Sequence, residues 1–182
     1  MKVGLYGGTF DPIHNGHLHV IKTLISQKLV DKLLVVPAGN PRLRDNQPQA
    51  TGAQRRQMCQ LAVNSLDDDV KQHVEVNPIE VLREGPSYTI DTVDAIAHTY
   101  PGATIVVIVG TDAYSKIEQW HRADELKQNV EFLIIDRPDF PGSANLQIDA
   151  LKVSATQIRE RKSDAVPAAV AAFIKENNLY AS

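Results

Sequence analysis

Two histidines three positions apart, His14 and His17, follow a pair of glycines near the start of this 182-residue sequence. Gly7 and Gly8 have no Cβ, so an anionic group can approach their backbone N–H groups closely. His17 lies at the expected start of a helix, where free N–H groups and the helix dipole favour anions. An imidazole adds a directed donor and ordinarily titrates near neutrality. Together these residues indicate a polyphosphate site.

Two common phosphate-binding motifs are excluded in this stretch. Its glycines follow the pattern G-x-x-G-G, which lacks the G-x-G-x-x-G spacing of a dinucleotide fingerprint, and no G-x-x-x-x-G-K-[ST] P-loop is present. The alternative is a strand–turn–helix with ordinary surface histidines. That two histidines coincide with a Gly-Gly turn and a helix start favours the phosphate interpretation.

A second candidate site for phosphate lies near the other end of the sequence. Ser154 is a candidate N-cap, and its hydroxyl, the first N–H groups of the following helix and Arg159 can all face a phosphate. A simple capped helix without a ligand is the alternative.

Three residues between these ends are suited to bind other parts of a nucleotide. Thr89 is expected at a helix N-terminus, which can hold a carboxylate, and Trp120 offers a flat face for stacking an aromatic ring. Asp112 follows an apolar strand and is placed to bind ribose hydroxyls. A core tryptophan and a helix-capping aspartate are the alternatives.

The composition limits the classes of function. Hydrophobic residues make up 43% of the chain and charged residues 23%, with a net charge of −3, as expected of a globular protein and not of a general nucleic-acid binder. Cys59 is the only cysteine, so neither an intrachain disulfide nor a C-x-x-C metal site can form. No signal peptide or membrane span is recognisable, and we expect a cytoplasmic protein. Homo-oligomerisation stays open.

The elements that must position these residues alternate along the chain. Short apolar runs predict strands at 2–6, 33–36, 104–109 and 130–135, with weaker candidates at 73–77 and 79–82 and an edge strand at 147–153. Helices are predicted at 16–29 with Asn15 as N-cap, from Thr51 to about 66, at 89–98, in two short pieces around Trp120, at 156–161 and after Pro167.

Alternating strands and helices predict an α/β fold with a doubly wound parallel sheet, formed by one domain over residues 1–182. Ligands of such sheets bind beyond the carboxyl ends of the strands, at the topological switch point. The residues that follow strands are therefore expected to converge on one cleft: Gly7–Phe10, Pro37–Arg44, Gly110–Asp112 and Arg137.

Several motifs together resemble one family. The segment GGTFDPIHNGHL resembles the H-x-G-H signature of the nucleotidyltransferase superfamily, and VSATQIR resembles its I-S-S/A-T-x-[IL]-R motif. The segments GPSYTIDT, Gly110-Thr111-Asp112 and Trp120-His121 are similar to those of the nicotinate mononucleotide adenylyltransferase family, and this resemblance covers essentially the whole chain.

The resemblance implies a Rossmann-like fold and transfer of the adenylyl group from ATP to nicotinate mononucleotide, with Mg²⁺ held mainly by substrate phosphates and no metal site made by the protein. His14, His17 and Arg159 would be catalytic. ATP would be bound by Gly7, Gly8, Thr9, Phe10, His17, Gly110, Asp112, Arg137, Ser154, Thr156 and Arg159. The acceptor would be bound by Tyr88, Thr89, Trp120, His121 and Arg44. The partners would be these two small molecules, without nucleic acid or membrane.

The loop after the second strand departs from the family pattern. Many members carry a P-P-H-K-like segment there, whereas this chain has Asn40-Pro41-Arg42-Leu43-Arg44. Arg44 can replace the lysine, or Arg42 and Arg44 can simply solvate the loop. Two other functions stay open: adenylyl transfer to nicotinamide mononucleotide or another phosphorylated acceptor such as phosphopantetheine, and a non-catalytic nucleotide sensor. A fragment of tRNA-ligating machinery is disfavoured by the acidic composition.

Overall fold

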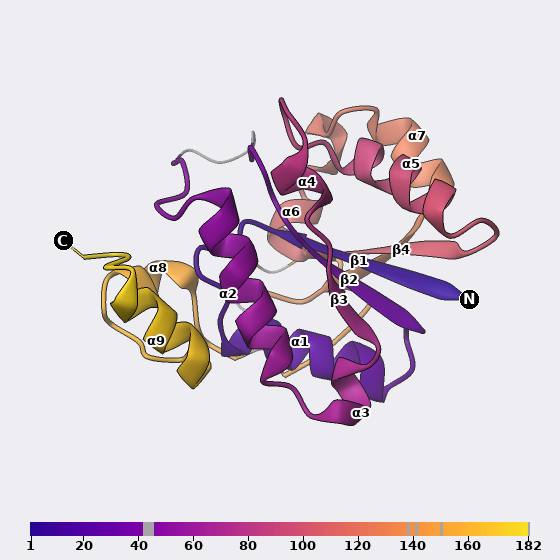
Figure 1. Cartoon of the computed structure of the whole chain (residues 1–182). Coiled ribbons are helices and arrows are strands. Elements are labelled where there is room, and N and C mark those ends of the chain that lie inside the picture. Colours follow the sequence, from indigo (N-terminus) through magenta and orange to yellow (C-terminus); the bar gives the residue numbers. More distant parts are fainter. Residues whose placement is uncertain (42–45, 138, 141, 150, 182) are drawn as a thin grey trace.

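A parallel sheet forms the centre of the computed structural model, which describes residues 1–41, 46–137, 139, 140, 142–149 and 151–181. Its strands are β1 (Lys2–Gly8), β2 (Lys32–Pro37), β3 (Val74–Val76), β4 (Thr104–Gly110) and β5 (Glu131–Ile135). Their order is β3-β2-β1-β4-β5, and every pair is parallel (Figure 1). The predicted doubly wound α/β sheet is confirmed, and its switch point lies between β1 and β4.

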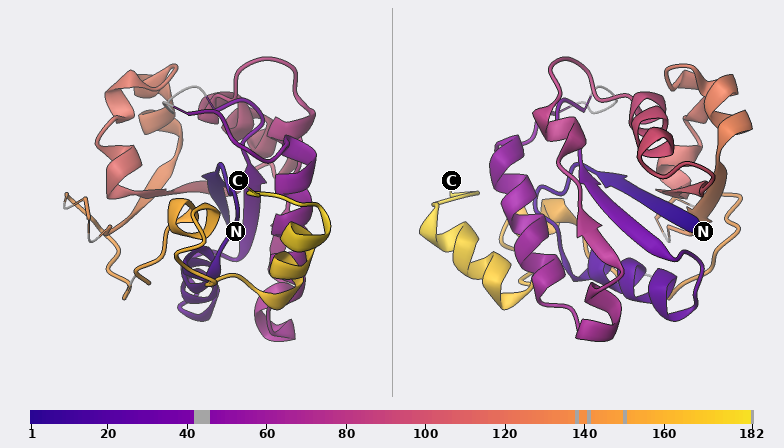
Figure 2. Two further views of the ribbon diagram at one scale, coloured as in Figure 1. Left: turned by 90° about the vertical axis from the view of Figure 1, so that its left-hand side faces the viewer. Right: turned by 45° about the vertical axis from the view of Figure 1, so that its right-hand side comes forward.

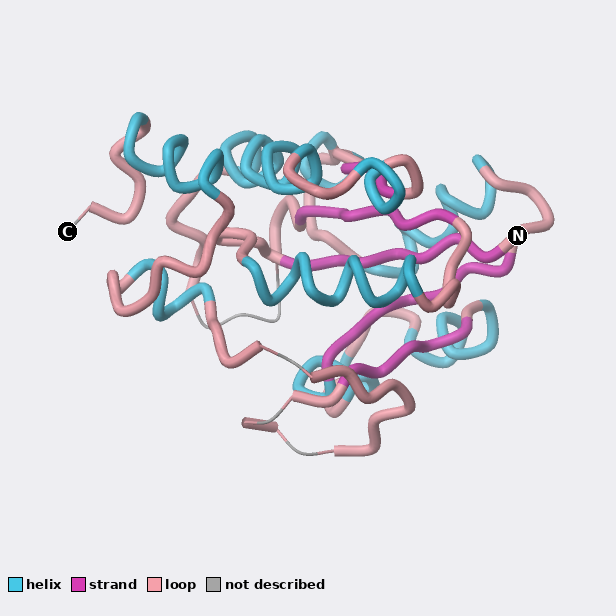
Figure 3. The backbone as a smooth tube through the Cα atoms, turned by 90° about the horizontal axis from the view of Figure 1, so that it is seen from below, coloured by secondary structure: helices cyan, strands magenta, loops and turns pink. Residues whose placement is uncertain are grey.

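Helices cover both faces of the sheet (Figures 1 and 3). One face carries α1 (Asn15–Ser26), α2 (Gly52–Asn64) and α9 (Ala168–Glu176), and α9 lies alongside α2 (Figure 2). The opposite face carries α5 (Thr89–Thr99) and α7 (Ala123–Asn129). None of the described helices is both long and apolar enough to cross a membrane.

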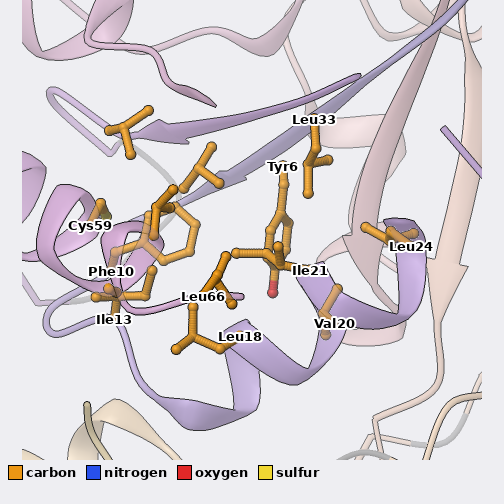
Figure 4. Close-up of a cluster of buried hydrophobic side chains, with 14 of the residues drawn as sticks. Tyr6, Phe10, Ile13, Leu18, Val20, Ile21, Leu24, Leu33, Cys59 and Leu66 are labelled. Carbon is orange, nitrogen blue, oxygen red and sulfur yellow. The ribbon is translucent and has the colours of Figure 1, made fainter. Parts of the chain in front are cut away.

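Alternation along the strands divides the buried side chains into two cores. Leu33 and Val35 of β2 face α1 and α2, whereas Leu34 and Val36 face α5. Figure 4 shows part of the first core, where Leu33 and side chains of α1 and α2 surround Tyr6 and Phe10. Burial of both strand faces explains why these strands are continuously apolar.

The predicted helix signals are confirmed where a capping residue marks the start. Thr51 and Gln54 form the expected capping box of α2, and Ser154 and Gln157 form one at the start of α8 (Ala155–Arg159). Pro167 directly precedes α9. The shorter elements are α3 (Asp68–Lys71), α4 (Ile79–Leu82), α6 (Thr111–Tyr114) and a 3₁₀ turn at Ile117–Gln119.

Two predicted strands are wrong. Residues 79–82 form α4, because Pro78 lacks the N–H that a continuing strand would need, and as the N-cap it accepts a hydrogen bond from Leu82 N at its carbonyl. Residues 147–153 form no strand in their described part. The side chain of Asn145 instead bonds the backbone of Phe132 and Ile134, and only Leu146 makes an isolated bridge to β5.

The start of α1 also differs from its prediction. His14, and not Asn15, is the N-cap residue, and Asn15 is the first helical residue. Gly7 and Gly8 are the last two residues of β1 and do not form a turn. The helix ends at Ser26 and α2 at Asn64, each a few residues earlier than expected.

Candidate active site

A cavity at the carboxyl edge of the sheet brings residues from both ends of the chain together. The imidazoles lie in it beside the ends of β4 and β5, and its lining consists of Tyr6, His14, Gly16, His17, Val20, Gly110, Ile135, Arg137, Leu151 and Val153. Of the residues predicted to converge on one cleft, Gly110 and Arg137 line this cavity, whereas Gly7–Phe10, Pro37 and Asp112 are not among its described lining residues. A larger cleft of about 270 Å³ lies between α8 and α9, but it is mostly apolar and contains no imidazole.

His14 and His17 are held in place at the N-terminus of α1. Their rings stack with centroids 3.7 Å apart, and the backbone N–H of His14 donates to Nδ1 of His17 over 3.1 Å. Because Nδ1 of His17 accepts this hydrogen bond, the proton of the neutral ring lies on Nε2. The N-cap geometry therefore makes Nε2 of His17 a hydrogen-bond donor.

His14 is buried, and its pKa differs from that of an ordinary imidazole. Its side chain is 3% exposed, and its Nδ1 makes no hydrogen bond within the described residues. Burial, and secondly the charge of Arg137, lower the pKa of His14 from 6.5 to about 4. His14 is therefore neutral at pH 7, and the expectation of a pKa near neutrality is wrong for it.

The two glycines of β1 have different surroundings. A Cβ on Gly7 would meet nothing within 4 Å, whereas one on Gly8 would lie 2.9 Å from the ring of Phe10. Pairing of β1 with β4 stops at Tyr6 in the described structure, while pairing with β2 continues to Gly8. Gly7 thus adjoins open space at the switch point, and the missing Cβ of Gly8 makes room for a protein side chain.

Phe10, predicted to bind ATP, has its ring in the protein core. Its backbone adopts a left-handed conformation, with φ of 49°. The ring meets His17 edge to face at 5.0 Å and Tyr6 at 5.7 Å. Phe10 therefore supports the His17 ring from within the core, and Thr9 beside it is likewise buried.

The ends of β4 and β5 bring Asp112 and Arg137 together. Oδ1 of Asp112 is buried, accepts no hydrogen bond from the described residues and lies 3.7 Å from Nε of Arg137. Thr111 joins the two segments, since its Oγ1 accepts from Arg137 N and donates to the carbonyl of Phe140. A Cβ on Gly110 would collide with the side chains of both Asp112 and Arg137, so a larger residue there would displace them.

The serine–arginine motif lies against the loop before α1. Nη1 of Arg159 donates to the carbonyl of Asp11 over 2.7 Å, and Nη2 donates to Oγ1 of Thr156. Oγ of Ser154 accepts from Gln157 N. Val153 packs against Gly16 and lines the cavity, although Arg159 is not among the cavity-lining residues. The two ends of the chain therefore meet at Asp11 and Gly16.

The four described residues predicted to bind the acceptor form a separate group around α5. Tyr88 is the N-cap of α5 and Thr89 its first residue. The ring of Tyr88 stacks on His121 with centroids 4.2 Å apart, and the neighbouring Trp120 is partly buried against the second core. Within the described structure this group does not line the cavity of His17. Arg44 lies outside the described residues, as does Arg42.

Sequence reasoning missed two buried charged residues that organise the site. The carboxylate of Asp11 accepts from the backbone N–H groups of Gln49 and Ala50 and from the hydroxyl of Tyr180. Arg55 is 1% exposed and donates to the carbonyls of Thr9, Gly39 and Ala50. Arg55 is spaced helically with Met58, Cys59 and Ala62, so its position on the buried face of α2 was readable from the sequence.

Ser87, within the GPSYT segment, also has a role that its sequence did not reveal. Its Oγ accepts hydrogen bonds from the backbone N–H groups of Gly39 and Asn40, both at 3.0 Å. The segment before α5 therefore holds the loop that follows β2. This contact joins the predicted acceptor region to the carboxyl edge of the sheet.

Comparison with known proteins agrees with this arrangement. The cytidylyltransferase-like family matches residues 5–161. The chain is 34% identical to a probable nicotinate-nucleotide adenylyltransferase of Bacillus pumilus and 33% identical to the nicotinate-nucleotide adenylyltransferase of Bacillus subtilis, in each case over 100% of this chain and 99% of the relative.

Solved structures share the fold. A nicotinic acid mononucleotide adenylyltransferase of Plasmodium falciparum complexed with NaAD superimposes with a TM-score of 0.83 at 19% identity, covering 98% of this chain and 97% of the other. Full-length identity above 30% to several relatives establishes the family more closely than fold alone. The chain belongs to the cytidylyltransferase-like nucleotidyltransferases and, within them, to the nicotinate-nucleotide adenylyltransferase family.

Proposed function

We propose that this protein transfers the adenylyl group of ATP to nicotinate mononucleotide, giving deamido-NAD and pyrophosphate. The observation that carries the proposal is the cavity at the switch point, where His14, His17 and Arg137 meet beside Gly110. Its donors are nitrogen atoms of imidazole and guanidinium groups, which suit phosphate oxygens. The 30–34% identity to relatives named for this activity supports the same reaction.

The reaction needs positioning more than acid–base chemistry. The 5′-phosphate of the acceptor is largely dianionic at neutral pH, since its second pKa is about 6. One of its oxygens forms a bond to the α-phosphorus of ATP as the bond from that phosphorus to the bridging oxygen breaks, and pyrophosphate leaves. No general base and no covalent enzyme intermediate are required, so the protein must hold two anions together and stabilise the developing charge.

We assign distinct electrostatic roles to the residues around the cavity. Nε2 of His17 donates to the α-phosphate, while the neutral His14 supports the ring of His17 by stacking. Arg137 and Arg159 supply positive charge along the triphosphate. Asp112, whose buried Oδ1 accepts no hydrogen bond from the described residues, accepts from a ribose hydroxyl.

Magnesium enters this scheme with the nucleotide. No group of three His, Cys, Asp or Glu side chains suited to hold a metal is found in the described parts of the chain. The donors that line the cavity bind phosphate oxygens, so they would hold a nucleotide that itself carries Mg²⁺. The ion would neutralise part of the phosphate charge.

The acceptor is assigned to the group around α5. Free N–H groups at the N-terminus of this eleven-residue helix, at Thr89, suit the carboxylate of nicotinate. Trp120, Tyr88 and His121 offer aromatic faces for the pyridine ring. We further propose that residues 1–182 form one nucleotidyltransferase domain, since α8 and α9 pack back onto the loop before α1 and onto α2.

Pyrophosphate release with a panel of acceptors tests the proposed function. The protein is incubated with ATP and Mg²⁺ and with nicotinate mononucleotide, nicotinamide mononucleotide or phosphopantetheine. We expect the fastest turnover with nicotinate mononucleotide, because helix N–H groups favour a carboxylate over an amide. Faster release with another acceptor would reassign the substrate, and nucleotide binding without pyrophosphate release would indicate a sensor.

A further inference from the structure

Asp11 connects three parts of the molecule that are distant in sequence. Its Oδ2 accepts from Gln49 N at 2.8 Å, and its Oδ1 accepts from Ala50 N at 3.1 Å and from the hydroxyl of Tyr180 at 2.7 Å. Its carbonyl oxygen accepts from Nη1 of Arg159 at 2.7 Å. One buried residue, 3% exposed, therefore binds both the hydroxyl of Tyr180 and the guanidinium of Arg159.

Tyr180 is well suited to be a permanent donor to Asp11. Its ring packs against the first core, and it follows α9, which is fixed to that core by the buried side chain of Val170. Burial and the hydrogen bond to Asp11 raise the pKa of Tyr180, so its hydroxyl stays protonated. The donor is thus held both by packing and by charge-assisted hydrogen bonding.

We propose that Tyr180 is a positioning residue for Arg159: its hydroxyl fixes Asp11, whose carbonyl in turn fixes the guanidinium that meets the triphosphate. This inference rests on the proposed function, because it assigns Arg159 to ATP. Tyr180 itself is not among the described residues that line the cavity of His17. Without its hydroxyl, Asp11 loses one of the hydrogen bonds that orient it, and the guanidinium loses its defined place.

The substitution Tyr180→Phe tests the inference because it removes the hydroxyl and keeps the ring in the core. We expect the dissociation constant for ATP with Mg²⁺, measured by calorimetry, and the KM for ATP to rise about fivefold, the effect of one hydrogen bond. The KM for nicotinate mononucleotide should change less than about twofold. Measurements are made at least about 20 °C below the melting midpoint of each variant, so that a loss of stability alone leaves them unchanged.

A double-mutant cycle shows whether the effect passes through Arg159. In the Arg159→Lys background, Tyr180→Phe should weaken ATP binding less than about twofold further. Tyr100→Phe is the matched control, because Tyr100 is also partly buried but lies at the end of α5, beside Lys32. Its ATP affinity should equal that of the wild type.

The outcomes separate this inference from the proposed function. Wild-type turnover is measured first in the same assay, and its absence would overturn the proposed function together with the inference. Active wild-type protein whose ATP affinity is unchanged by Tyr180→Phe would overturn the inference alone. An equal loss of affinity on Tyr180→Phe in the wild type and in the Arg159→Lys variant would also overturn it, since the effect would then bypass Arg159.

Discussion

The rings of His14 and His17 at the start of α1 stack on each other, but their surroundings give them different roles. His17 is polarised by a backbone N–H at Nδ1 and donates through Nε2, whereas His14 is buried and neutral. The spacing of the histidines was readable from the sequence. The burial of His14 and its low pKa were not, because they depend on the folded site, to which a distant strand brings Arg137.

Replacing His17 with alanine tests its assignment to the α-phosphate. We expect His17→Ala to lower kcat by about 100-fold or more, the usual cost of losing a preorganised donor. Circular dichroism should show an unchanged fold. His19→Ala on the same helix is the control and should retain wild-type turnover. Near-normal pyrophosphate release by His17→Ala would remove the assignment.

The state of His14 predicts a pH dependence of stability. In the unfolded chain His14 titrates near 6.5, and in the folded protein near 4. As pH falls from 6.5 to 4, the unfolded state gains a proton that the folded state does not, so the free energy of unfolding decreases by about 3 kcal/mol and then levels off. Denaturant titrations measure this change.

The variant His14→Asn provides the comparison for those titrations. It removes the titrating imidazole, so its stability should depend less steeply on pH between 6.5 and 4. Equal slopes for the wild type and the variant would contradict the assigned protonation state.

At the scale of single elements, strand β1 both packs within the sheet and borders the candidate site. Substitutions at its glycines distinguish these two roles. Gly4 lies within the sheet, where an added Cβ would be 2.8 Å from the side chain of Leu33, and Gly7 faces open space. Gly7→Ala should therefore keep wild-type stability but raise the KM for ATP about tenfold, because its methyl group occupies the place of the nucleotide. Thermal melting and initial rates measure the two effects.

Gly4→Ala is the converse control for the same strand. Overpacking should lower the free energy of unfolding by about 1–3 kcal/mol while the KM for ATP stays unchanged. If Gly7→Ala left the KM for ATP unaltered, the nucleotide would not approach β1 at that position.

The elements predicted correctly are those whose signals are local. Capping residues such as Thr51 and Ser154 marked helix starts, and continuous apolar runs marked the central strands. The error at 79–82 has a local cause in Pro78, whereas the error at 147–153 arose where a distant contact decided the conformation. Asn145 takes over the hydrogen bonding that an edge strand would have supplied, and nothing in the local alternation of residues 147–153 reveals this.

At the scale of the whole molecule, Arg55 holds two loops of the carboxyl edge together. Its guanidinium bonds Thr9 after β1 and Gly39 after β2 from the buried face of α2. Arg55→Lys keeps the charge but cannot reproduce the planar set of donors, and buried carbonyls lose their partners. We expect a loss of about 2–4 kcal/mol in the free energy of unfolding.

The neighbouring Arg56 supplies the control for that prediction. It is exposed on the same helix, so Arg56→Lys should change stability by less than about 0.5 kcal/mol. Chemical denaturation measures both variants. A similar small change for Arg55→Lys would show that its hydrogen bonds to the loops do not stabilise the fold.

The position of β1 between β2 and β4 places one side of the candidate site on the central strand of the sheet. Its backbone amides are bonded in the middle of the sheet, so they should be among the slowest in the protein to exchange with deuterated solvent. Opening of α8 and α9 would release Arg159 while Gly7 and the start of α1 keep their places. The part of the phosphate site formed by β1 and the start of α1 would then open less often than the part formed by α8, which carries Arg159.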